Sequence, residues 1–198
     1  MKNIVSGFEL QKFNEVKENS FSAKTHMLNE FIKDDKIYLP IKDIGGIYFF
    51  WWTGNIDFFM NSAIKCYYNL KGKRSLSELV KVEFSADWIE KSTFDNKICL
   101  YIGKSTNIKG RVSKHLKLQT KDIWRNYNKN NGSKPNSESQ LRIGIERIFD
   151  KHLSDGLIDN ISISWFDLSG YNNGINRFYL ENYLIGKYFP LFNIDIER

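Results

Sequence analysis

The chain has 198 residues and a formal net charge of +6 at pH 7, with 41% hydrophobic and 15% aromatic residues. This composition excludes an intrinsically disordered chain, which lacks the apolar residues needed to bury a core, and the length predicts a single domain over residues 1–198. The two cysteines, Cys66 and Cys99, form neither a disulfide framework nor a zinc-binding set, and we expect Cys99 to be buried. The positive charge fits either an acidic partner or a solvated surface.

The longest apolar run, Ile44–Trp52, is shorter than the ~18 residues of a membrane helix. The first residues also lack the long apolar segment of a signal peptide. We therefore expect a cytoplasmic protein with no membrane partner.

In the first half of the chain, residues 1–44 are interpreted as an N-terminal extension with weak helical patterns over 8–16 and 26–32. Residues 45–52, GGIYFFWW, have the aromatic and β-branched composition of a strand, and 98–102 predict a second strand. Residues 53–97 separate the two strands. We expect one or two helices there, one of them starting at Ser75-Leu76-Ser77-Glu78.

In the second half, Thr106 or Asn107 is expected to cap a helix that runs to about Leu118. A polar loop, 119–137, follows. Ser137-Glu138-Ser139-Gln140 matches a capping box and precedes a periodic helix that we expect Gly156 to end. Residues 161–168 alternate like a half-buried strand, and 175–187 predict a last helix before Pro190. Strands and helices in this order predict a mixed α/β (α+β) domain whose sheet is partly covered by helices.

One stretch, CLYIGKSTNIKGRVSKHL at 99–116, combines a buried strand, a glycine and a basic helix start. On the helix, an apolar stripe of Ile108, Val112 and Leu116 has Arg111 and His115 at its edge, one turn apart. With Lys104 at the strand end, this arrangement favours a phosphate, because helix-start N–H groups, an arginine fork and an ammonium all attract negative charge. The alternative is a packed edge histidine beside solvated cations.

The last helix carries Glu181 on the face that holds Phe178, Leu184 and Ile185. A carboxylate on an apolar face is costly unless it meets a cation or a metal. Arg177, one turn earlier, is a possible partner. The alternative is a metal-binding carboxylate aimed into the same cleft as Arg111, with Mg²⁺ completed by a substrate phosphate and water.

These motifs together resemble the GIY-YIG nucleases. Gly46-Ile47-Tyr48 and Tyr101-Ile102-Gly103 match the two signature tripeptides, at the start of the first strand and the end of the second. The other matches, in chain order, are the family's helical arginine, a polar position often filled by His or Tyr, its metal-binding glutamate and its asparagine after the last helix: Arg111, His115, Glu181 and Asn193. The resemblance covers about residues 45–52 and 98–195.

The resemblance implies a small central three-stranded, mainly antiparallel sheet flanked by helices. The nuclease core would span 45–198, after the extension 1–44, with an insertion, 53–97, between the first two core strands. Family members usually join the two signature tyrosines by a short hairpin, whereas here about 45 residues are inserted. Such an insertion is most reminiscent of the restriction-endonuclease branch.

The chemistry implied by the resemblance is hydrolysis of a DNA phosphodiester by a water molecule, with one Mg²⁺ or Mn²⁺ as cofactor. Glu181 would hold the metal and Arg111 would stabilise charge on the phosphate. Tyr48 would orient or deprotonate the water, with Lys104 lowering its pKa. Tyr101 would shape the site, His115 would transfer a proton or contact the phosphate, and Asn193 would brace the site.

Double-stranded DNA is the expected partner, and the insertion 53–97 and the loop 119–137 are the expected places where it is read. The candidate nucleic-acid-binding residues there are Lys71, Lys73, Arg74, Lys121, Arg125, Lys129 and Lys134, with Trp124 and Tyr127 interleaved. For any one of these residues, a solvated surface is the alternative.

Three functions follow from these expectations. The first is a site-specific double-strand endonuclease like a type II restriction enzyme, acting as a homodimer on DNA because one active site cuts one strand. The second is a repair, junction, flap or mobile-element nuclease. The third is a catalytically silent DNA-binding module.

Overall fold

A central antiparallel sheet organises the protein, with strands in the order β1-β9-β4-β8-β7. Its three long strands are β9 (Ile161–Asp167), β4 (Gly46–Trp52) and β8 (Lys97–Ser105), and two-residue strands β1 (His26–Met27) and β7 (Thr93–Phe94) flank them. The computed structural model describes residues 9–20, 23–33, 36–71, 79–117, 139–151, 156–170 and 173–194. The protein is therefore of the α+β class, and its sheet is wider than the three strands expected.

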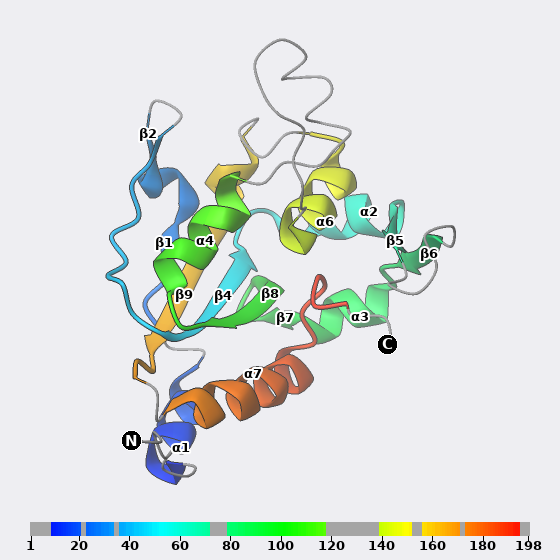
Figure 1. The fold of residues 1–198 in the computed structure, drawn as a ribbon. Coiled ribbons are helices and arrows are strands. Elements are labelled where there is room, and N and C mark those ends of the chain that lie inside the picture. Colours follow the sequence, from blue (N-terminus) through cyan, green and yellow to red (C-terminus); the bar gives the residue numbers. More distant parts are fainter. Residues whose placement is uncertain are drawn as a thin grey trace.

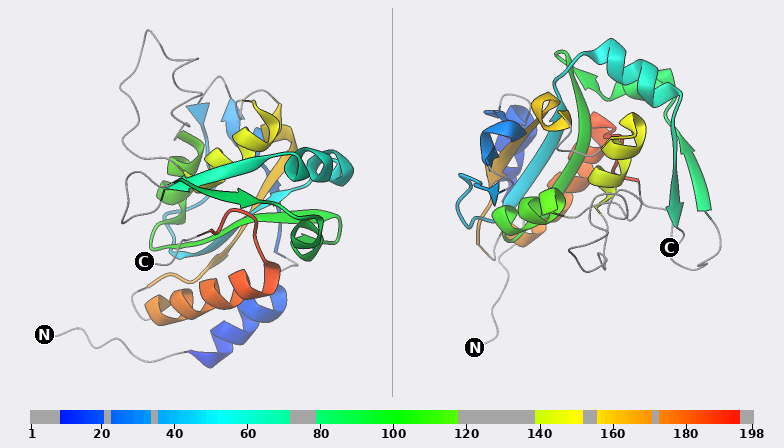
Figure 2. Two further views of the ribbon diagram at one scale, coloured as in Figure 1. Left: turned by 90° about the vertical axis from the view of Figure 1, so that its right-hand side faces the viewer. Right: turned by 90° about the horizontal axis from the view of Figure 1, so that it is seen from above.

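Helices cover both faces of this sheet (Figures 1 and 2). One face carries α7 (Gly174–Tyr188), with α1 (Leu10–Asn19) packed on its outer side. The other carries α4 (Ile108–Lys117), α6 (Gln140–Phe149) and α2 (Ile56–Ile64). The central strand is consequently enclosed between two helical layers.

The composition of β4 follows from that enclosure. All seven of its residues are buried. Tyr48, Phe50 and Trp52 join the core under α4 and α6, while the alternate residues Ile47, Phe49 and Trp51 join the core under α7. Because successive strand residues point to opposite faces, a strand with both faces covered is apolar throughout.

The insertion between β4 and β8 differs from the expectation of helices alone. After α2 come β5 (Tyr67–Lys71) and β6 (Leu79–Glu83), which pair antiparallel as a separate two-stranded sheet, and then α3 (Ala86–Lys91). The helix start expected at Ser75 lies outside the described residues, and a continuation of that helix through 79–83 is excluded, because these residues form a strand whose β-branched valines favour an extended backbone.

The N-terminal extension also differs in part. The first helical pattern corresponds to α1, but the second corresponds to β1, the short 3₁₀ helix η1 (Leu28–Phe31) and β2 (Ile32–Lys33), which pairs with β3 (Lys36–Ile37). The predicted helix rested on the three-residue spacing of apolar residues such as Leu28 and Phe31. Both are buried, but a single 3₁₀ turn produces the same spacing.

The predicted helices after the two core strands are confirmed with corrected ends. Asn107 accepts the N–H of Gly110 at 2.7 Å at the start of α4, and Ser139 accepts that of Arg142 at the start of α6. Helix α6 ends at Phe149, followed by Asp150 in the left-handed region, rather than at Gly156. Gly156, at a φ of 87°, instead precedes the 3₁₀ helix η2 (Leu157–Asn160).

Cys99 is fully buried, as expected. Among the helices in the described part of the chain, none is long and apolar enough to span a bilayer.

Candidate functional site

The candidate site lies where β8 runs along the edge of the sheet. Strand β7 pairs only with Lys97 and Ile98, so on the side away from β4 the described residues provide no strand partner for β8 from Cys99 onward. The segment after α7 covers part of this edge, because Leu191 and Phe192 donate backbone N–H groups to the carbonyls of Cys99 and Leu100. Farther along β8, the side chains of Asn193 and Glu181 bond the backbone of Ile102 and Lys104.

Asn193 supplies the next pair of hydrogen bonds along this edge. Its amide oxygen accepts the N–H of Ile102 at 2.7 Å, and its amide nitrogen donates to the carbonyl of Ile102 at 2.6 Å. The side chain thus takes the place of a backbone unit in a missing strand. This geometry holds the β8 backbone at Ile102, and the bracing role of Asn193 in a catalytic site stays a prediction.

Gly103 provides the space in which the Tyr48 side chain lies. The two residues are directly opposite each other on β8 and β4. A Cβ atom at position 103 would lie 2.3 Å from the Tyr48 hydroxyl oxygen and 2.4 Å from Cζ. The glycine of the second tripeptide is therefore required by the tyrosine of the first.

Tyr48 and His115 form a buried hydrogen-bonded pair. The Tyr48 hydroxyl lies 3.0 Å from Nε2 of His115, and Nδ1 of His115 lies 2.8 Å from the hydroxyl of Ser139. Burial, and secondarily the charge of Arg111, lowers the pKa of His115 to about 3. The imidazole is consequently neutral at pH 7. Sequence reasoning missed Ser139, because the capping-box match 137–140 has Ser137 at the cap position, whereas the structure has Ser139 there.

Arg111 connects the two tyrosines. Its residue is exposed on α4, and its guanidinium is close enough to Tyr48 and Tyr101 to work against the rise in the pKa of both phenols. Partial burial works to lower the pKa of Arg111, but its bonds and attraction to the two phenols outweigh this and raise it. A cation fixed at this point faces the edge of the sheet from the α4 side.

Both phenols are held in the protonated form. Burial is the largest cause that raises the pKa of Tyr48, and the negative charge of Glu181 adds to it. Burial likewise raises the pKa of Tyr101, whose ring lies 6.2 Å from that of Tyr48 and 5.1 Å from that of His115. The carboxylate of Glu181 is therefore close enough to act electrostatically on both tyrosines.

Glu181 reaches the same edge from α7, on the opposite face. Its Oε1 accepts the backbone N–H of Lys104 at 3.0 Å, the next edge group after Ile102. Its Oε2 forms an ion pair with the Lys104 ammonium. A backbone hydrogen bond and a charge thus hold the carboxylate at the end of β8.

Two expectations about this helix are wrong. Arg177 does not pair with Glu181. Its guanidinium donates instead to the backbone carbonyls of Leu168 and Gly170. Phe178 is not on the buried face, because 51% of its surface is exposed. The buried face runs through Leu180, Leu184 and Tyr188, and Glu181 lies at the border between that face and solvent.

One expected role is corrected. Lys104 does not lower the pKa of Tyr48, since its ammonium is bound by Glu181 and burial raises the pKa of the phenol. The roles expected of His115, proton transfer or contact with the phosphate, stay predictions. Burial and the charge of Arg111 both lower its pKa, so His115 would act as a neutral imidazole.

Among the predicted site residues, Glu181 is the one carboxylate that would hold a metal ion. Within the described ranges, no cluster of three or more His, Cys, Asp or Glu side chains could hold an ion. Glu181 still fits Mg²⁺ in a limited sense, because Mg²⁺ is often bound by one or two carboxylates together with substrate phosphates and water. The lysine ammonium at Oε2 shows that this oxygen accepts a cation.

The candidate nucleic-acid-binding residues stay predictions. Lys71 ends strand β5. The others lie outside the described residues: Lys73, Arg74, Lys121, Arg125, Lys129 and Lys134.

Comparison with known proteins gave no match to a family model, a curated protein or a solved structure.

Proposed function

We propose that the protein is a divalent-metal-dependent DNA endonuclease of the GIY-YIG type that hydrolyses phosphodiester bonds. One observation carries this proposal. Tyr48, Tyr101 and Arg111 gather on one face of the β8 edge, within electrostatic reach of Glu181 on the other face. A cation, a fixed carboxylate and two phenols at one open edge form a set of groups suited to a phosphate ester.

The fold supports the same family. The strands that position the site are the three long ones, β9, β4 and β8, all antiparallel and flanked by helices. We propose that they form the three-stranded core of a GIY-YIG nuclease, with β1 and β7 as additions at its edges. The hairpin β5–β6 and helices α2 and α3 would be decorations of that core.

Arg111 binds the phosphate in this proposal. Its guanidinium lies near Tyr48 and Tyr101 and stays charged at any physiological pH. It would donate hydrogen bonds to a non-bridging oxygen, where negative charge grows as water attacks. The two phenols are diagonal neighbours on β4 and β8, with ring centroids 6.2 Å apart.

Tyr48 orients the attacking water. With His115 neutral, the Tyr48 hydroxyl can donate its proton to Nε2, which leaves the phenol oxygen to accept from water. Ser139 bonds the other ring nitrogen and so fixes the imidazole. Tyr48, His115 and Ser139 then form a chain of hydrogen bonds that orients the phenol oxygen as an acceptor for the water.

Glu181 would hold the Mg²⁺ or Mn²⁺ ion, which when bound would polarise the phosphate and stabilise the leaving oxygen. The hydrogen bond from the backbone of Lys104 orients its Oε1. The ammonium of Lys104 would turn from Oε2 toward the phosphate. Asn193 holds the β8 backbone on which this arrangement depends.

Site-specific double-strand cleavage by a homodimer, as by a type II restriction enzyme, is the function we favour, on the length of the insertion alone. The basic residues of 53–97 and 119–137 would contact the DNA. Repair, junction or mobile-element nucleases use the same chemistry.

The test is incubation of the purified protein with long duplex DNA of diverse sequence, with Mg²⁺, with Mn²⁺ or with EDTA. Discrete fragments that require the metal support a site-specific nuclease, and cleavage confined to flap or junction substrates supports a repair nuclease. Absence of cleavage on duplex, flap and junction DNA by folded protein that still binds DNA would replace the proposal by a silent binding module.

A further inference from the structure

The exposed side of α7 carries aromatic residues that the proposed reaction does not use. Phe178, Tyr179 and Tyr183 expose 51%, 54% and 37% of their surfaces. With about 100° per residue, the helix places them in one arc that begins beside Glu181 and passes through Phe178, Asn182 and Tyr179 to Tyr183. This arc, which we call the aromatic arc, is continuous with the candidate active site.

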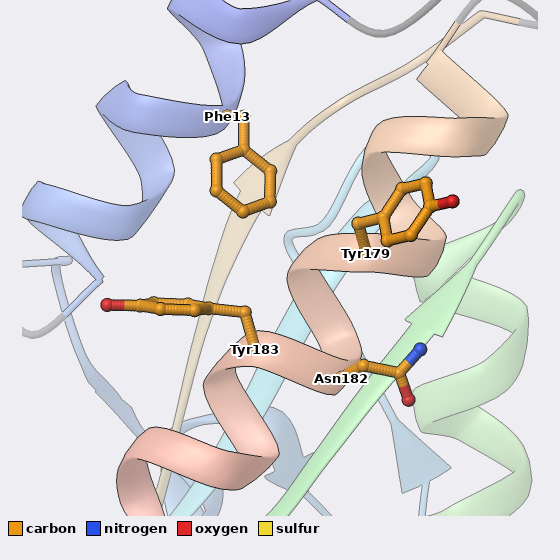
Figure 3. Close-up of a pocket in the computed structure, with 4 residues that line it drawn as sticks. All are labelled: Phe13, Tyr179, Asn182 and Tyr183. Atoms are coloured by element: carbon orange, nitrogen blue, oxygen red, sulfur yellow. The ribbon is translucent and has the colours of Figure 1, made fainter.

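The aromatic arc borders a hollow between α7 and α1. The hollow has a volume of about 530 Å³ and is lined by Phe13, Tyr179, Asn182 and Tyr183. Figure 3 shows Phe13 facing α7 from α1, with Tyr179 and Tyr183 projecting from α7 in different directions. Phe13 and Tyr183 contact edge to face, with ring centroids 5.9 Å apart. The hollow lies within the size range of small-ligand sites.

Lysines lie over the rings at the two ends of the aromatic arc. The ammonium of Lys104 is 5.1 Å from the centre of the Phe178 ring, and that of Lys17 is 5.3 Å from the centre of the Tyr183 ring. Lys187 adds a third ammonium, which donates to the carbonyl of Lys17. The Tyr183 end of the arc therefore carries the ammonium groups of Lys17 and Lys187, while at the Phe178 end the ammonium of Lys104 is paired with Glu181. An apolar face bordered by lysines complements a partner with flat apolar groups on an anionic backbone.

Single-stranded nucleic acid has that chemistry. Its bases stack on aromatic side chains while lysines follow the backbone. Asn182 can also contact a base edge: its amide nitrogen donates to the carbonyl of Phe178, which leaves the amide oxygen as an acceptor. A base held inside a duplex cannot reach a side chain in this way, because its faces are covered by its neighbours.

We propose that the aromatic arc binds an unpaired nucleotide of the substrate, next to the phosphate held at Glu181 and Arg111. The inference rests on the proposed nuclease chemistry and specifies its substrate class as DNA with a single-stranded segment at the cleavage site, which favours the repair or junction alternative over the double-strand, restriction-like enzyme. Tyr179 provides the main stacking surface. Phe178 connects this nucleotide to the active site, because its ring contacts Lys104, the partner of Glu181.

The experiment measures binding without cleavage. Glu181→Gln protein in EDTA is titrated into two fluorescent DNAs of the same duplex sequence, one blunt and one with a 5′ single-stranded tail, and anisotropy gives Kd. Tyr179→Ala in this background is expected to weaken binding of the tailed DNA about tenfold and to leave the blunt duplex unchanged. Tyr38→Ala, which removes a tyrosine that is 58% exposed elsewhere, is the matched control and should change neither.

Each other outcome overturns the inference. An equal loss on both DNAs, or no loss on either, excludes stacking of an unpaired base. A dimer in sedimentation without DNA that Tyr179→Ala dissociates would make the aromatic arc an interface between two copies of the chain. The proposed function can fail independently of this inference. If tailed DNA binds in a Tyr179-dependent way but wild-type protein never cleaves it, nucleotide binding by the aromatic arc is supported and the nuclease proposal is contradicted.

Discussion

The hydroxyl of Tyr48 lies 3.0 Å from Nε2 of His115, and both side chains are buried between the sheet and α4. This pair places an imidazole that cannot be charged at pH 7 directly behind the phenol that faces Arg111. The Tyr48 phenol therefore lies between the cation of Arg111 and the neutral imidazole of His115. The pair also makes the stability of the protein depend on pH.

Stability should fall as the pH drops below 6.5. The unfolded chain protonates His115 with a pKa near 6.5, whereas the folded protein does so only near 3, so the unfolded state binds more protons between these values. We expect this group to reduce the free energy of unfolding by about 2 kcal/mol between pH 7 and pH 5. Urea unfolding of wild-type and His115→Gln protein at the two pH values measures it. A loss as large in His115→Gln as in wild type, with His26→Gln as the matched control, would contradict the assignment.

Gly103→Ala should disturb the site through the position of Tyr48. The added Cβ would lie 2.3 Å from the phenol oxygen, so the buried ring must move. We expect a loss of about 1–3 kcal/mol in stability, typical of overpacking, together with loss of cleavage. The matched control is Gly186→Ala on α7, where a Cβ meets nothing within 4 Å and should stabilise the helix by about 0.5–1 kcal/mol. Equal melting temperatures for Gly103→Ala and wild type would show that the ring is not confined.

Asn193→Ala should destabilise the edge of β8. The change leaves the N–H and the carbonyl of Ile102 without their side-chain partners, and we expect a cost of about 2 kcal/mol. Hydrogen exchange at Ile102 should accelerate more than at the centre of β4. Asn19→Ala removes an exposed bond on α1 and serves as the control, with a change below about 0.5 kcal/mol. Unaltered exchange at Ile102 would mean that water replaces the asparagine at no cost.

Lys104→Met should strengthen Mn²⁺ binding in the absence of DNA. The ammonium of Lys104 now occupies Oε2 of Glu181, so its removal frees that oxygen. A partly exposed ion pair contributes roughly 1 kcal/mol or less, and the expected gain in affinity is a few fold. Electron paramagnetic resonance of free Mn²⁺ measures the binding directly, with Lys104→Arg, which keeps the pair, as control. Unchanged affinity in Lys104→Met, or binding retained in Glu181→Gln, would place the metal elsewhere.

The sequence predicted those helices and strands whose buried residues recur at the regular spacing of the element. Strand β4 was recognisable because both of its faces are covered, and Ile108, Val112 and Leu116 predicted α4 because every fourth residue faces the core. The hairpin β5–β6 was missed because its strands belong to a separate sheet. The spacing of Ser75 and Glu78, between the two strands, also matched the start of a helix.

The sequence predicted which residues belong to the candidate site, but not which side chains they contact in the folded protein. Nothing local in the sequence indicates that Lys104 rather than Arg177 meets Glu181, because the choice depends on which residue of β8 lies at the sheet edge opposite α7. In the sequence, Ser139 stood only as an inner residue of the capping-box match 137–140. Its bond to His115 joins residues 24 apart in the chain, from two helices that pack on the same face.

The central claim is that Glu181 and Tyr48 serve one phosphodiester cleavage. Its most direct test is single-turnover cleavage of DNA with Mg²⁺ by wild type, Glu181→Gln, Tyr48→Phe and the surface control Glu90→Gln, each with its DNA affinity. We predict that Glu181→Gln and Tyr48→Phe bind DNA like wild type but cleave at least about 10²-fold more slowly, while Glu90→Gln retains full activity. Cleavage at the wild-type rate by folded Glu181→Gln or Tyr48→Phe protein would contradict the claim.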